Sequence, residues 1–380
     1  MAVRGRIGPW CSLAVAAGVV GMALATSASA ARTPLDGSGM WIWYVSHSGG
    51  SAGAIAEQAR KHRLRTVLIK SSDGASAWSQ FTPRLVSNLH RRGMRVCAWQ
   101  FVYGNSPVAE ARRGAEAVAD GADCLAIDAE SSYEGRYRSA DRYIRELRDR
   151  IGHRYPLALT SFPYVDYHPA LPYSVFLGRG GATLNVPQVY WRAIGDSVTT
   201  SLRHTYRWNR PYHRPIYPLG QTYQDPPREQ LRRFRRLTTG YGARGVSWWS
   251  WQETGGREWN AIGRRIHGPY PHPKRTFPSL AQGSRGDTVV LLQELLRAAG
   301  QKVGITGIFG DGTARAVRRF QNGDGIDPSG NAKAATWRAL RRFRPARVNW
   351  KRKGNPAHVR VRLAPALPPA LELPSTPGRP

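Results

Sequence analysis

Apolar and polar positions follow two rhythms along the chain. After Gly39, short runs rich in β-branched and aromatic residues recur about every 25 to 30 residues. Between them lie longer segments whose apolar residues follow a helical period. The predicted strands are 40–46, 66–72, 95–104, 124–130, 157–164, 184–191, 215–223 and 245–253. Eight strands alternating with helices predict an α/β fold, a (β/α)₈ TIM-type barrel over 38–268, because such barrels usually need about 250 residues. A doubly wound sheet is the alternative, but no glycine-rich phosphate loop follows the first run.

Start and stop signals mark the helical segments. In 106–121, Ser106 is the expected N-cap, Pro107 follows at the first helical position and Gly121 lies near the end. In 139–152, Ser139 is the expected cap and Gly152 ends the pattern. The segments 82–93 and 227–240 carry similar apolar stripes.

The N-terminus predicts export. Arg4 and Arg6 precede an apolar run over 11–25, and small residues then lead to a cleavage position after Ala30. This is the layout of a secretory signal peptide, predicted over 1–30. An uncleaved membrane anchor is the alternative, but the run is short for a membrane span. We therefore expect a secreted, wall-associated protein without a membrane segment after cleavage.

The charge balance adds a candidate partner. The chain has 56 Lys and Arg against 25 Asp and Glu, a formal net charge of +31. Such an excess favours an anionic partner such as an acidic wall polymer, although arginines scattered over helix faces would give the same sum. No nucleic-acid-binding motif is present, so we expect no nucleic acid partner. Prolines predict a stiff linker over 269–279, and a basic, Pro-rich and disordered tail over 343–380.

The segment 280–342 predicts a separate helical module. One helix ends at Gly300, and two further blocks share a spacing: Gly307 precedes Thr313 by six residues, as Gly330 precedes Thr336. The segment resembles the peptidoglycan-binding-domain-1 family, a three-helix module. The resemblance is carried by Gly283 to Gly286, Leu292–Gln293, Gly307 to Gly310, Thr313 through Phe320–Gln321, Gly325–Ile326 and Thr336–Trp337.

That resemblance implies peptidoglycan as a partner. The polar turn residues Asp311 and Asn322 are the candidate wall contacts, whereas Phe320 is expected in the core. Thr306 departs from the family, whose members often have Asp at that place. A binding module on a spacer raises the local concentration of an enzyme at an insoluble substrate.

The ends of the predicted strands carry the candidate chemistry, because a barrel of this kind places its active site there. Aromatic rings, which stack on sugar rings, and amides, which pair with hydroxyls, dominate these ends. The candidate substrate-binding residues are Asp73, Tyr103, Gln188, Tyr190, Gln221, Trp249 and Trp251.

Two carboxylates end the fourth strand. Asp128 and Glu130 are two residues apart, so their side chains point the same way and their Cα atoms lie about 6.5–7 Å apart. Like charges this close raise the pKa of one carboxyl, which leaves an acid beside an anion, as glycoside hydrolysis requires. The alternative is a structural salt link, for instance to Lys70. We predict Glu130 and Asp128 as the catalytic pair.

The fourth strand resembles the Asp-x-Glu strand end of family 18 chitinases and family 25 lysozymes. Asp123 stands at an earlier Asp of the chitinase pattern, but Ala126 replaces the middle one, and the first strand lacks the Asp of family 25. Gln188 to Tyr190 resembles the chitinase motif whose Tyr contacts the acetamido group. The resemblance implies a retaining, substrate-assisted glycosidase of muramidase or N-acetylglucosaminidase type that needs no cofactor.

Several alternatives stay open. The barrel is an active peptidoglycan glycosidase, a non-catalytic wall-binding protein, or a hydrolase of another exported glycan such as chitin. The ten His residues are scattered, so no metal site is predicted. Cys97 and Cys124 either form a disulfide, which export would permit, or are buried small hydrophobes. We expect a monomer.

Overall fold

The structure is a computed structural model that describes residues 1–2, 31–351 and 356. Most of the predicted signal peptide and most of the predicted tail lie outside the described residues. Among the described residues, the helices are too short or too polar for any of them to cross a membrane.

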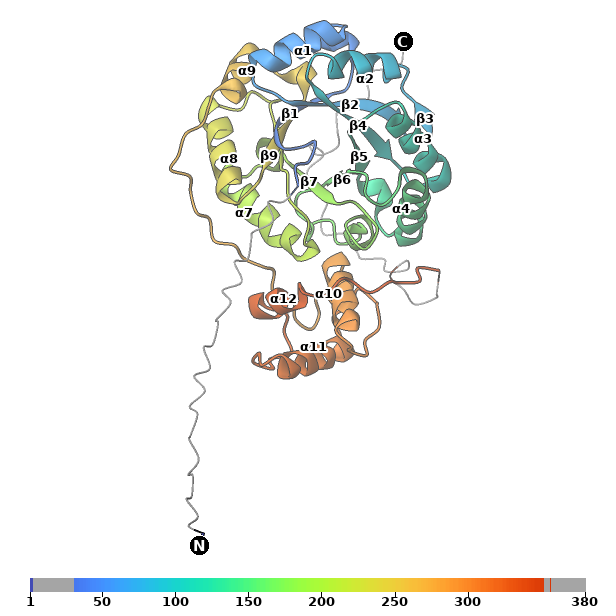
Figure 1. Cartoon of the computed structure of the whole chain (residues 1–380), viewed down its shortest axis with the longest axis vertical. Helices are drawn as coiled ribbons and strands as arrows, with labels where there is room; N and C mark the ends of the chain where they lie inside the picture. Colours follow the sequence, from blue (N-terminus) through green and yellow to red (C-terminus); the bar gives the residue numbers. More distant parts are fainter. Residues whose placement is uncertain (3–30, 352–355, 357–380) are drawn as a thin grey trace. The chain divides into compact units, whose positions relative to one another are not determined.

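Eight parallel strands close into a barrel, which confirms the predicted fold class (Figure 1). The strands are β1 (Gly37–Ile42), β2 (Thr66–Asp73), β4 (Arg95–Val102), β5 (Cys124–Ala129), β6 (Leu157–Ser161), β7 (Leu184–Val189), β8 (Leu219–Gln221) and β9 (Gly245–Trp249). Each pairs in parallel with the next strand along the barrel, and β1 pairs with both β9 and β2, which closes the ring. The short β3 (Ser76–Ala77) adds an antiparallel hairpin to β2.

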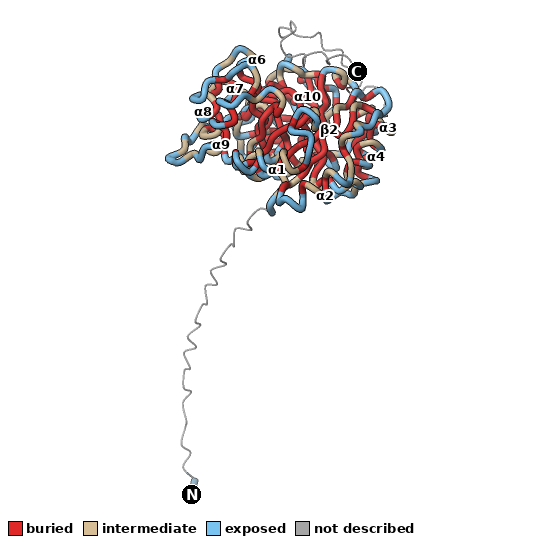
Figure 2. Tube along the Cα trace, turned by 90° about the horizontal axis from the view of Figure 1, so that it is seen from above, coloured by how far each residue is buried: buried red, intermediate tan, exposed pale blue. Residues whose placement is uncertain are grey.

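Helices surround the strands. They are α1 (Ala52–Lys61), α2 (Pro83–His90), α3 (Pro107–Ala119), α4 (Tyr137–Ile151), α5 (Tyr173–Phe176), α6 (Trp191–Ile194), α7 (Val198–Asn209), α8 (Arg228–Gly240) and α9 (Gly256–Gly263). Buried segments lie at the strands and at the inward helix faces, and exposed residues lie on the outer faces (Figure 2). Short 3₁₀ turns follow β1, β5, α7 and β9, namely η1 (Ser46–Ser48), η2 (Ser131–Tyr133), η3 (Arg210–Tyr212) and η4 (Trp251–Glu253).

Capping residues and prolines in the sequence predicted most of the examined helix starts correctly. Thr82 caps α2 through a hydrogen bond from the Leu85 amide, and Pro107 opens α3. The expected cap at Ser139 is wrong, because α4 begins at Tyr137 and Ser139 lies inside the helix. The earlier start lets the Tyr137 ring, which is 2% exposed, join the core.

Tryptophans fill the interior of the barrel. Trp41, Trp99 and Trp249 have ring centroids 5.4 to 5.9 Å apart, and Trp43 lies 5.6 and 5.7 Å from two of them. Below the strand ends, Cys97 and Cys124 are register partners on β4 and β5 and form a disulfide. This settles the pairing that the sequence left open.

Residues 280–340 form three helices, α10 (Asp287–Ala298), α11 (Asp311–Gly323) and α12 (Ala334–Leu340). Two buried glutamines explain the repeated spacing. Gln293 accepts from the Gly307 amide and donates to the Thr313 hydroxyl. Gln321 likewise accepts from the Gly330 amide and donates to Thr336. Each glutamine therefore fixes the turn that leads into the next helix.

The module contacts the barrel through the first turn of α10. The Asp287 carboxylate, which is fully buried, accepts from the Ser174 amide, the Ser174 hydroxyl and the Tyr212 hydroxyl, each at 2.7 Å. The Asp287 amide also donates to the Pro169 carbonyl at 2.7 Å. A charged residue at this junction is possible because barrel donors saturate it.

The segment after α12 differs from the expected disorder in its described part. Trp350 is 6% exposed, and its ring lies 5.0 Å from that of Tyr137 on α4. The Ala346 amide donates to the Glu294 carbonyl of α10. One large aromatic residue gives this Pro- and Arg-rich stretch enough apolar area to pack. The overall composition of the segment does not reveal the effect of a single residue.

Candidate active site

The carboxyl pair lies where β5 leaves the barrel. Asp128 is the next-to-last residue of β5, and Glu130 is the first residue after the strand. Asp128 is 2% exposed and Glu130 is 7% exposed. Their side chains hydrogen-bond each other, as the two-residue spacing predicts. Ala126 and Cys124, which precede them at the same spacing, point into the barrel interior.

One amide side chain bridges both carboxyls. Gln188 Nε2 on β7 donates to Asp128 Oδ1 at 3.1 Å and to Glu130 Oε1 at 2.9 Å. Gln188 is itself 6% exposed, so these hydrogen bonds form away from bulk water. The amide therefore fixes the relative orientation of the two carboxyls.

Burial raises the pKa of both carboxyls, and the contact between them makes the two pKa values differ. The pKa of Asp128 lies well above its usual value, because of burial first and the neighbouring Glu130 second. Burial also raises the pKa of Glu130, but the hydrogen bonds from Gln188 and Asp128 oppose this rise. Burial and the neighbouring carboxyl therefore favour the protonated form of Asp128, whereas hydrogen bonds favour the ionised form of Glu130. Such a split of two neighbouring carboxyls is typical of acid–base sites.

The lysine that the sequence offered as a salt-link partner of this pair is buried and ion-paired with another carboxylate. Lys70 on β2 is 1% exposed, and its Nζ lies 2.7 Å from Asp73 Oδ2. The same nitrogen lies 4.3, 4.5 and 4.9 Å from the ring centroids of Trp43, Trp78 and Trp99. The positive charge of Lys70 partly opposes the rise in the pKa of Asp128 that burial causes. A lysine inside an otherwise apolar strand was the available signal, since such a residue is rarely buried without a partner.

Asp73 and Tyr103, both predicted as substrate contacts, are already partners of each other. The Tyr103 hydroxyl donates to Asp73 Oδ1 at 2.6 Å, and the Tyr103 side chain is 38% exposed. The Tyr103 ring also packs edge-on against Phe101, the register neighbour of Asp128. The structure therefore brings these two residues to the same strand ends as the carboxyl pair.

Tyr190 and Trp249 are two further predicted residues that lie buried at the strand ends of the barrel. Tyr190 is 3% exposed, and the electric fields of Asp128 and Glu130 contribute to its raised pKa after burial and the neighbouring Tyr223. Trp249 is 4% exposed, and its ring contacts those of Trp41, Trp43 and Trp99. Thr160, the register partner of Asp128 on β6, has a buried hydroxyl without a hydrogen-bond partner among the described residues. No sequence pattern pointed to Thr160.

Ala126 has a packing explanation. It is the register partner of Trp99 and is fully buried. A carboxylate there would lie among indole rings at a depth where charge is costly. Its small side chain leaves room for Trp99, so the missing Asp follows from the tryptophan-filled interior.

Three other predicted positions lie outside the group. Trp251 packs in η4 against Trp259 of α9, with ring centroids 4.9 Å apart, in the outer core. Gln221 is fully buried; it accepts from the Arg192 amide at 2.7 Å and donates to the Tyr223 carbonyl. Asp123 precedes β5 at the far end of the strand, where its carboxylate accepts from the Val96 amide.

The candidate wall contacts of the module are on its surface. Asp311 opens α11, is exposed and accepts from Gln282 Nε2 at 2.6 Å. Asn322 is exposed near the end of the same helix.

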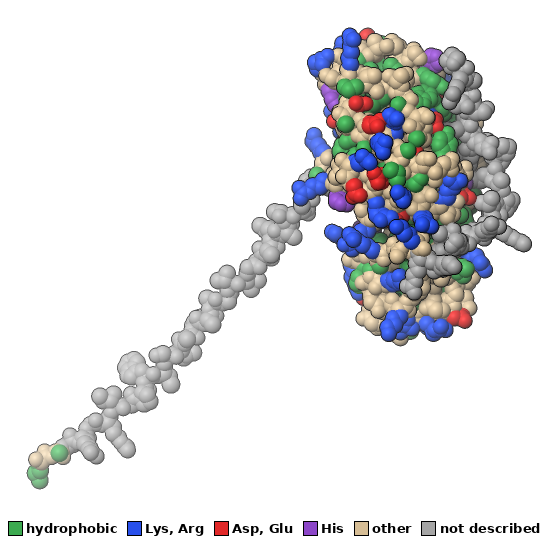
Figure 3. All heavy atoms as spheres, turned by 90° about the vertical axis from the view of Figure 1, so that its right-hand side faces the viewer, with side chains coloured by type: hydrophobic (Ala, Val, Ile, Leu, Met, Phe, Trp, Pro, Cys, Tyr) green, Lys and Arg blue, Asp and Glu red, His purple; other side chains and the backbone are tan. Residues whose placement is uncertain are grey.

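Among the residues that the structure describes, no group of three or more His, Cys, Asp or Glu could hold a metal ion. Figure 3 shows Lys and Arg side chains over much of the visible surface, with fewer Asp and Glu between them.

Solved structures similar to this chain share little sequence identity with it. The Bacillus cereus spore cortex-lytic enzyme SleL is 10% identical over 60% of this chain and 73% of that one, with a TM-score of 0.45. Active domain 2 of a thermostable chitinase from Pyrococcus furiosus is 12% identical over 61% and 93%, with a TM-score of 0.48. A dihydrodipicolinate synthase from Rhodopseudomonas palustris is 13% identical over 57% and 71%, with a TM-score of 0.34. Likenesses of this size do not distinguish one reaction from another.

The comparison with known families bears on the C-terminal module. No curated protein sequence matches the chain. Residues 285–340 match the family model described as a putative peptidoglycan binding domain, which confirms the resemblance predicted for this segment.

Proposed function

We propose that this protein is a secreted cell-wall glycoside hydrolase that cleaves the N-acetylated glycan of peptidoglycan, with its C-terminal module binding the same polymer. The observation that carries this proposal is the Asp128–Glu130 pair bridged by Gln188 at the strand ends of an aromatic-lined barrel. The match of residues 285–340 to a peptidoglycan-binding family supports the choice of polymer.

The proposed mechanism uses one proton and the substrate's own acetamido group. The proton on Asp128 passes to Glu130 across their hydrogen bond, and Glu130 gives it to the glycosidic oxygen as the bond to the anomeric carbon breaks. The acetamido oxygen bonds to that carbon from the opposite face. Ionised Asp128 accepts a hydrogen bond from the acetamido N–H and stabilises the positive charge, with Tyr190 assisting. Glu130 then takes a proton from water, which opens the intermediate with retention.

Gln188 and Lys70 support this chemistry by each favouring the ionised form of one carboxyl. The amide favours the ionised form of Glu130, and the ammonium favours the ionised form of Asp128 once its proton has left. A site buried this deeply strengthens each of these electrostatic effects relative to water. Tyr103 and Trp249 are the proposed stacking surfaces for the sugar.

The test compares wild type with Glu130→Gln on purified peptidoglycan, with products identified by mass spectrometry. We expect wild type to release glycan fragments with new reducing ends, and Glu130→Gln to lose activity by about a hundredfold or more. Glu229→Gln is the matched control, because Glu229 lies on the exposed face of α8. Full activity of Glu130→Gln would exclude the assignment.

A non-catalytic wall-binding barrel is the second candidate. Ala126 at the place of the chitinase Asp favours it, since that carboxylate assists the pair in the family that the strand resembles. The same experiment separates the two: binding to purified wall without any product, by wild type as well as by Glu130→Gln, would support the second candidate. Release from chitin but not from peptidoglycan would assign another exported glycan.

A further inference from the structure

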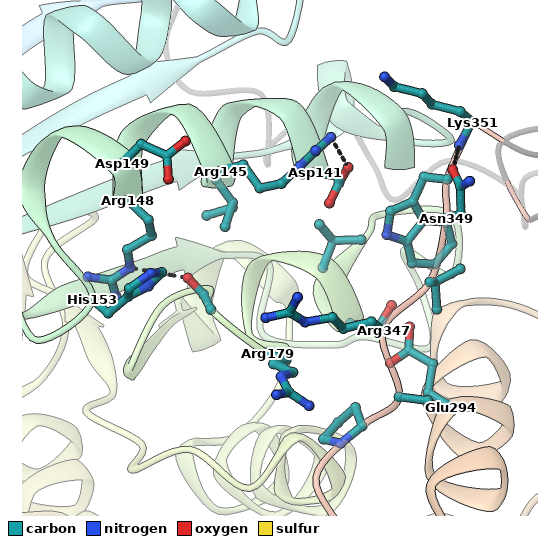
Figure 4. Close-up of a pocket in the computed structure, with 18 residues that line it drawn as sticks. Asp141, Arg145, Arg148, Asp149, His153, Arg179, Glu294, Arg347, Asn349 and Lys351 are labelled. Atoms are coloured by element: carbon teal, nitrogen blue, oxygen red, sulfur yellow. Dashed lines mark hydrogen bonds and ion pairs between the residues drawn. The ribbon is translucent and has the colours of Figure 1, made fainter.

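A cavity of about 620 Å³ lies outside the barrel, between α4, the loop after α5, helix α10 and the C-terminal segment 345–351 (Figure 4). This volume is within the range of pockets that hold small organic ligands, about 300–1,000 Å³. None of the residues that form the Asp128–Glu130 site lines it. The cavity is therefore a second site, separate from the proposed chemistry.

Two of the arginines that line the cavity are already satisfied. Arg148 is 2% exposed and donates to four backbone carbonyls, those of Gly152, Tyr155, Gly180 and Gly181. Arg145 pairs with Asp141 at 2.6 Å. These groups build the wall of the cavity and hold the loop after α5 against α4.

Three other basic side chains have no such partner. Within the described part of the chain, Arg179, Arg347 and Lys351 make no side-chain hydrogen bond or ion pair. They come from the loop after α5 and from the C-terminal segment, and all three line the cavity; Figure 4 draws Arg179 and Arg347 near its middle and Lys351 at its edge, beside α4. Unpaired cations that converge on a concave surface favour anionic groups such as carboxylates.

Glu294 supplies the opposite charge on the same wall. It belongs to α10 and is 3% exposed, yet its carboxyl has no hydrogen bond or ion pair with any described residue. Its backbone carbonyl anchors Ala346, so the C-terminal segment is held beside it. Burial, together with nearby Asp287, raises the pKa of Glu294 well above its usual value. A buried carboxyl without a partner is costly, and a donor from a ligand would remove that cost.

We propose that this cavity binds a short peptide with free carboxylates and a free amino group. Arg179, Arg347 and Lys351 take the carboxylates, and Glu294 takes the amino group. In the wall polymer such peptides are the stems attached to the glycan, and this identification rests on the proposed function. The enzyme would then recognise peptide-bearing glycan at a site remote from the bond it cuts.

The mixed lining argues against a phosphate polymer as the occupant. Asp141, Asp149 and Glu294 all line the cavity, so a chain of phosphates would meet three carboxyls. A zwitterionic peptide satisfies both signs of charge. Poly(glycerol phosphate) therefore serves as the competing probe.

The test is isothermal titration calorimetry of the full chain with the tripeptide alanyl-glutamyl-lysine, which has two carboxylates and two amines. We expect wild type to bind it, and Glu294→Gln to bind it roughly tenfold to a hundredfold more weakly. The tripeptide acetylated on both amines should bind wild type and Glu294→Gln equally. Arg179→Ala combined with Arg347→Ala should weaken binding of both peptides, and neither exposed arginine has contacts whose loss would unfold the chain.

Proton release gives an independent readout. An amino group beside Glu294 lowers the pKa of that carboxyl, so binding should release a proton, measured in buffers of different ionisation enthalpy; Glu294→Gln should release none. No tripeptide binding at millimolar concentration, equal binding by all variants, or binding of poly(glycerol phosphate) instead would overturn the proposal. Glu130→Gln should bind the tripeptide like wild type, so loss of hydrolysis and loss of peptide binding are distinguishable.

Discussion

The contact between Asp287 and the barrel offers a measurable test of how the module is held. In Asp287→Ala, the Ser174 amide, the Ser174 hydroxyl and the Tyr212 hydroxyl each lose an acceptor at 2.7 Å. The Ser174 amide cannot turn to a new partner, and a buried unsatisfied donor costs about 1–3 kcal/mol. With a smaller loss from the two hydroxyls, we expect the free energy of unfolding to fall by about 3 kcal/mol.

Asp311→Ala is the matched control. Asp287 and Asp311 both occupy the first turn of a module helix, where a carboxylate interacts favourably with the helix dipole. Asp311 is exposed and accepts one side-chain hydrogen bond, from Gln282. Its removal should cost only about 0.5–1 kcal/mol. The difference between the two variants therefore isolates the contacts with the barrel.

The assay is urea unfolding at pH 7, followed by circular dichroism and by limited proteolysis within residues 269–279. Asp287→Ala should unfold at lower urea than Asp311→Ala, and its linker should be cut faster in the absence of urea. Equal midpoints for the two variants, or an unchanged cleavage rate, would refute the reasoning that these buried hydrogen bonds hold the module on the barrel.

Four further changes have defined outcomes. Burial raises the pKa of Asp287 from 3.8 to about 6, so the native state keeps a proton that the unfolded state loses between these values. The stability difference between wild type and Asp287→Ala should therefore be larger at pH 4 than at pH 7, by up to about 3 kcal/mol, measured as unfolding free energy at both pH values. Gln188→Leu removes the donor that lowers the pKa of Glu130, so the alkaline limb of kcat/KM on peptidoglycan should move to higher pH and activity should fall by about tenfold or more; an unmoved limb would contradict the role of the amide. Lys70→Met leaves Asp73, which is partly exposed, without its ion pair and should lower the unfolding free energy by about 1–2 kcal/mol, whereas no loss in thermal or urea unfolding would mean that the aromatic rings alone hold this position. Replacement of both Cys97 and Cys124 by Ala opens a loop of sequence separation 27 and should cost about 3–4 kcal/mol in urea unfolding, with wild type under reducing conditions losing a similar amount.

Much of the candidate site follows from local pattern. The apolar run before Asp128 marked a buried strand, and the alternation of side chains put Asp128 and Glu130 on one face, where the structure has them. Gln188 and Tyr190 were found because a barrel brings its strand ends together whatever their separation in the chain. Trp251 and Gln221 were grouped with them by the same rule, but a strand end turns within one or two residues. Trp251 already lies in a 3₁₀ turn that faces α9. The Gln221 side chain forms its hydrogen bonds with the backbone of Arg192 and Tyr223.

The sequence by itself determined the periodic features of this protein: alternating strands and helices, the carboxyl pair on one strand face, and the repeated glycine–threonine spacing of the module. These depend on residues close together in the chain, whose spacing fixes their geometry. Only the tertiary structure decided which distant groups meet. It placed Lys70 among three indole rings, joined Cys97 to Cys124 and satisfied Asp287 with barrel donors. It also put Glu294 and three basic side chains on one cavity wall, where none of their side chains has a partner within residues 31–351. The physical reason is that burial and partners, rather than residue type, set the energy of a charged group, and both arise only when remote segments pack.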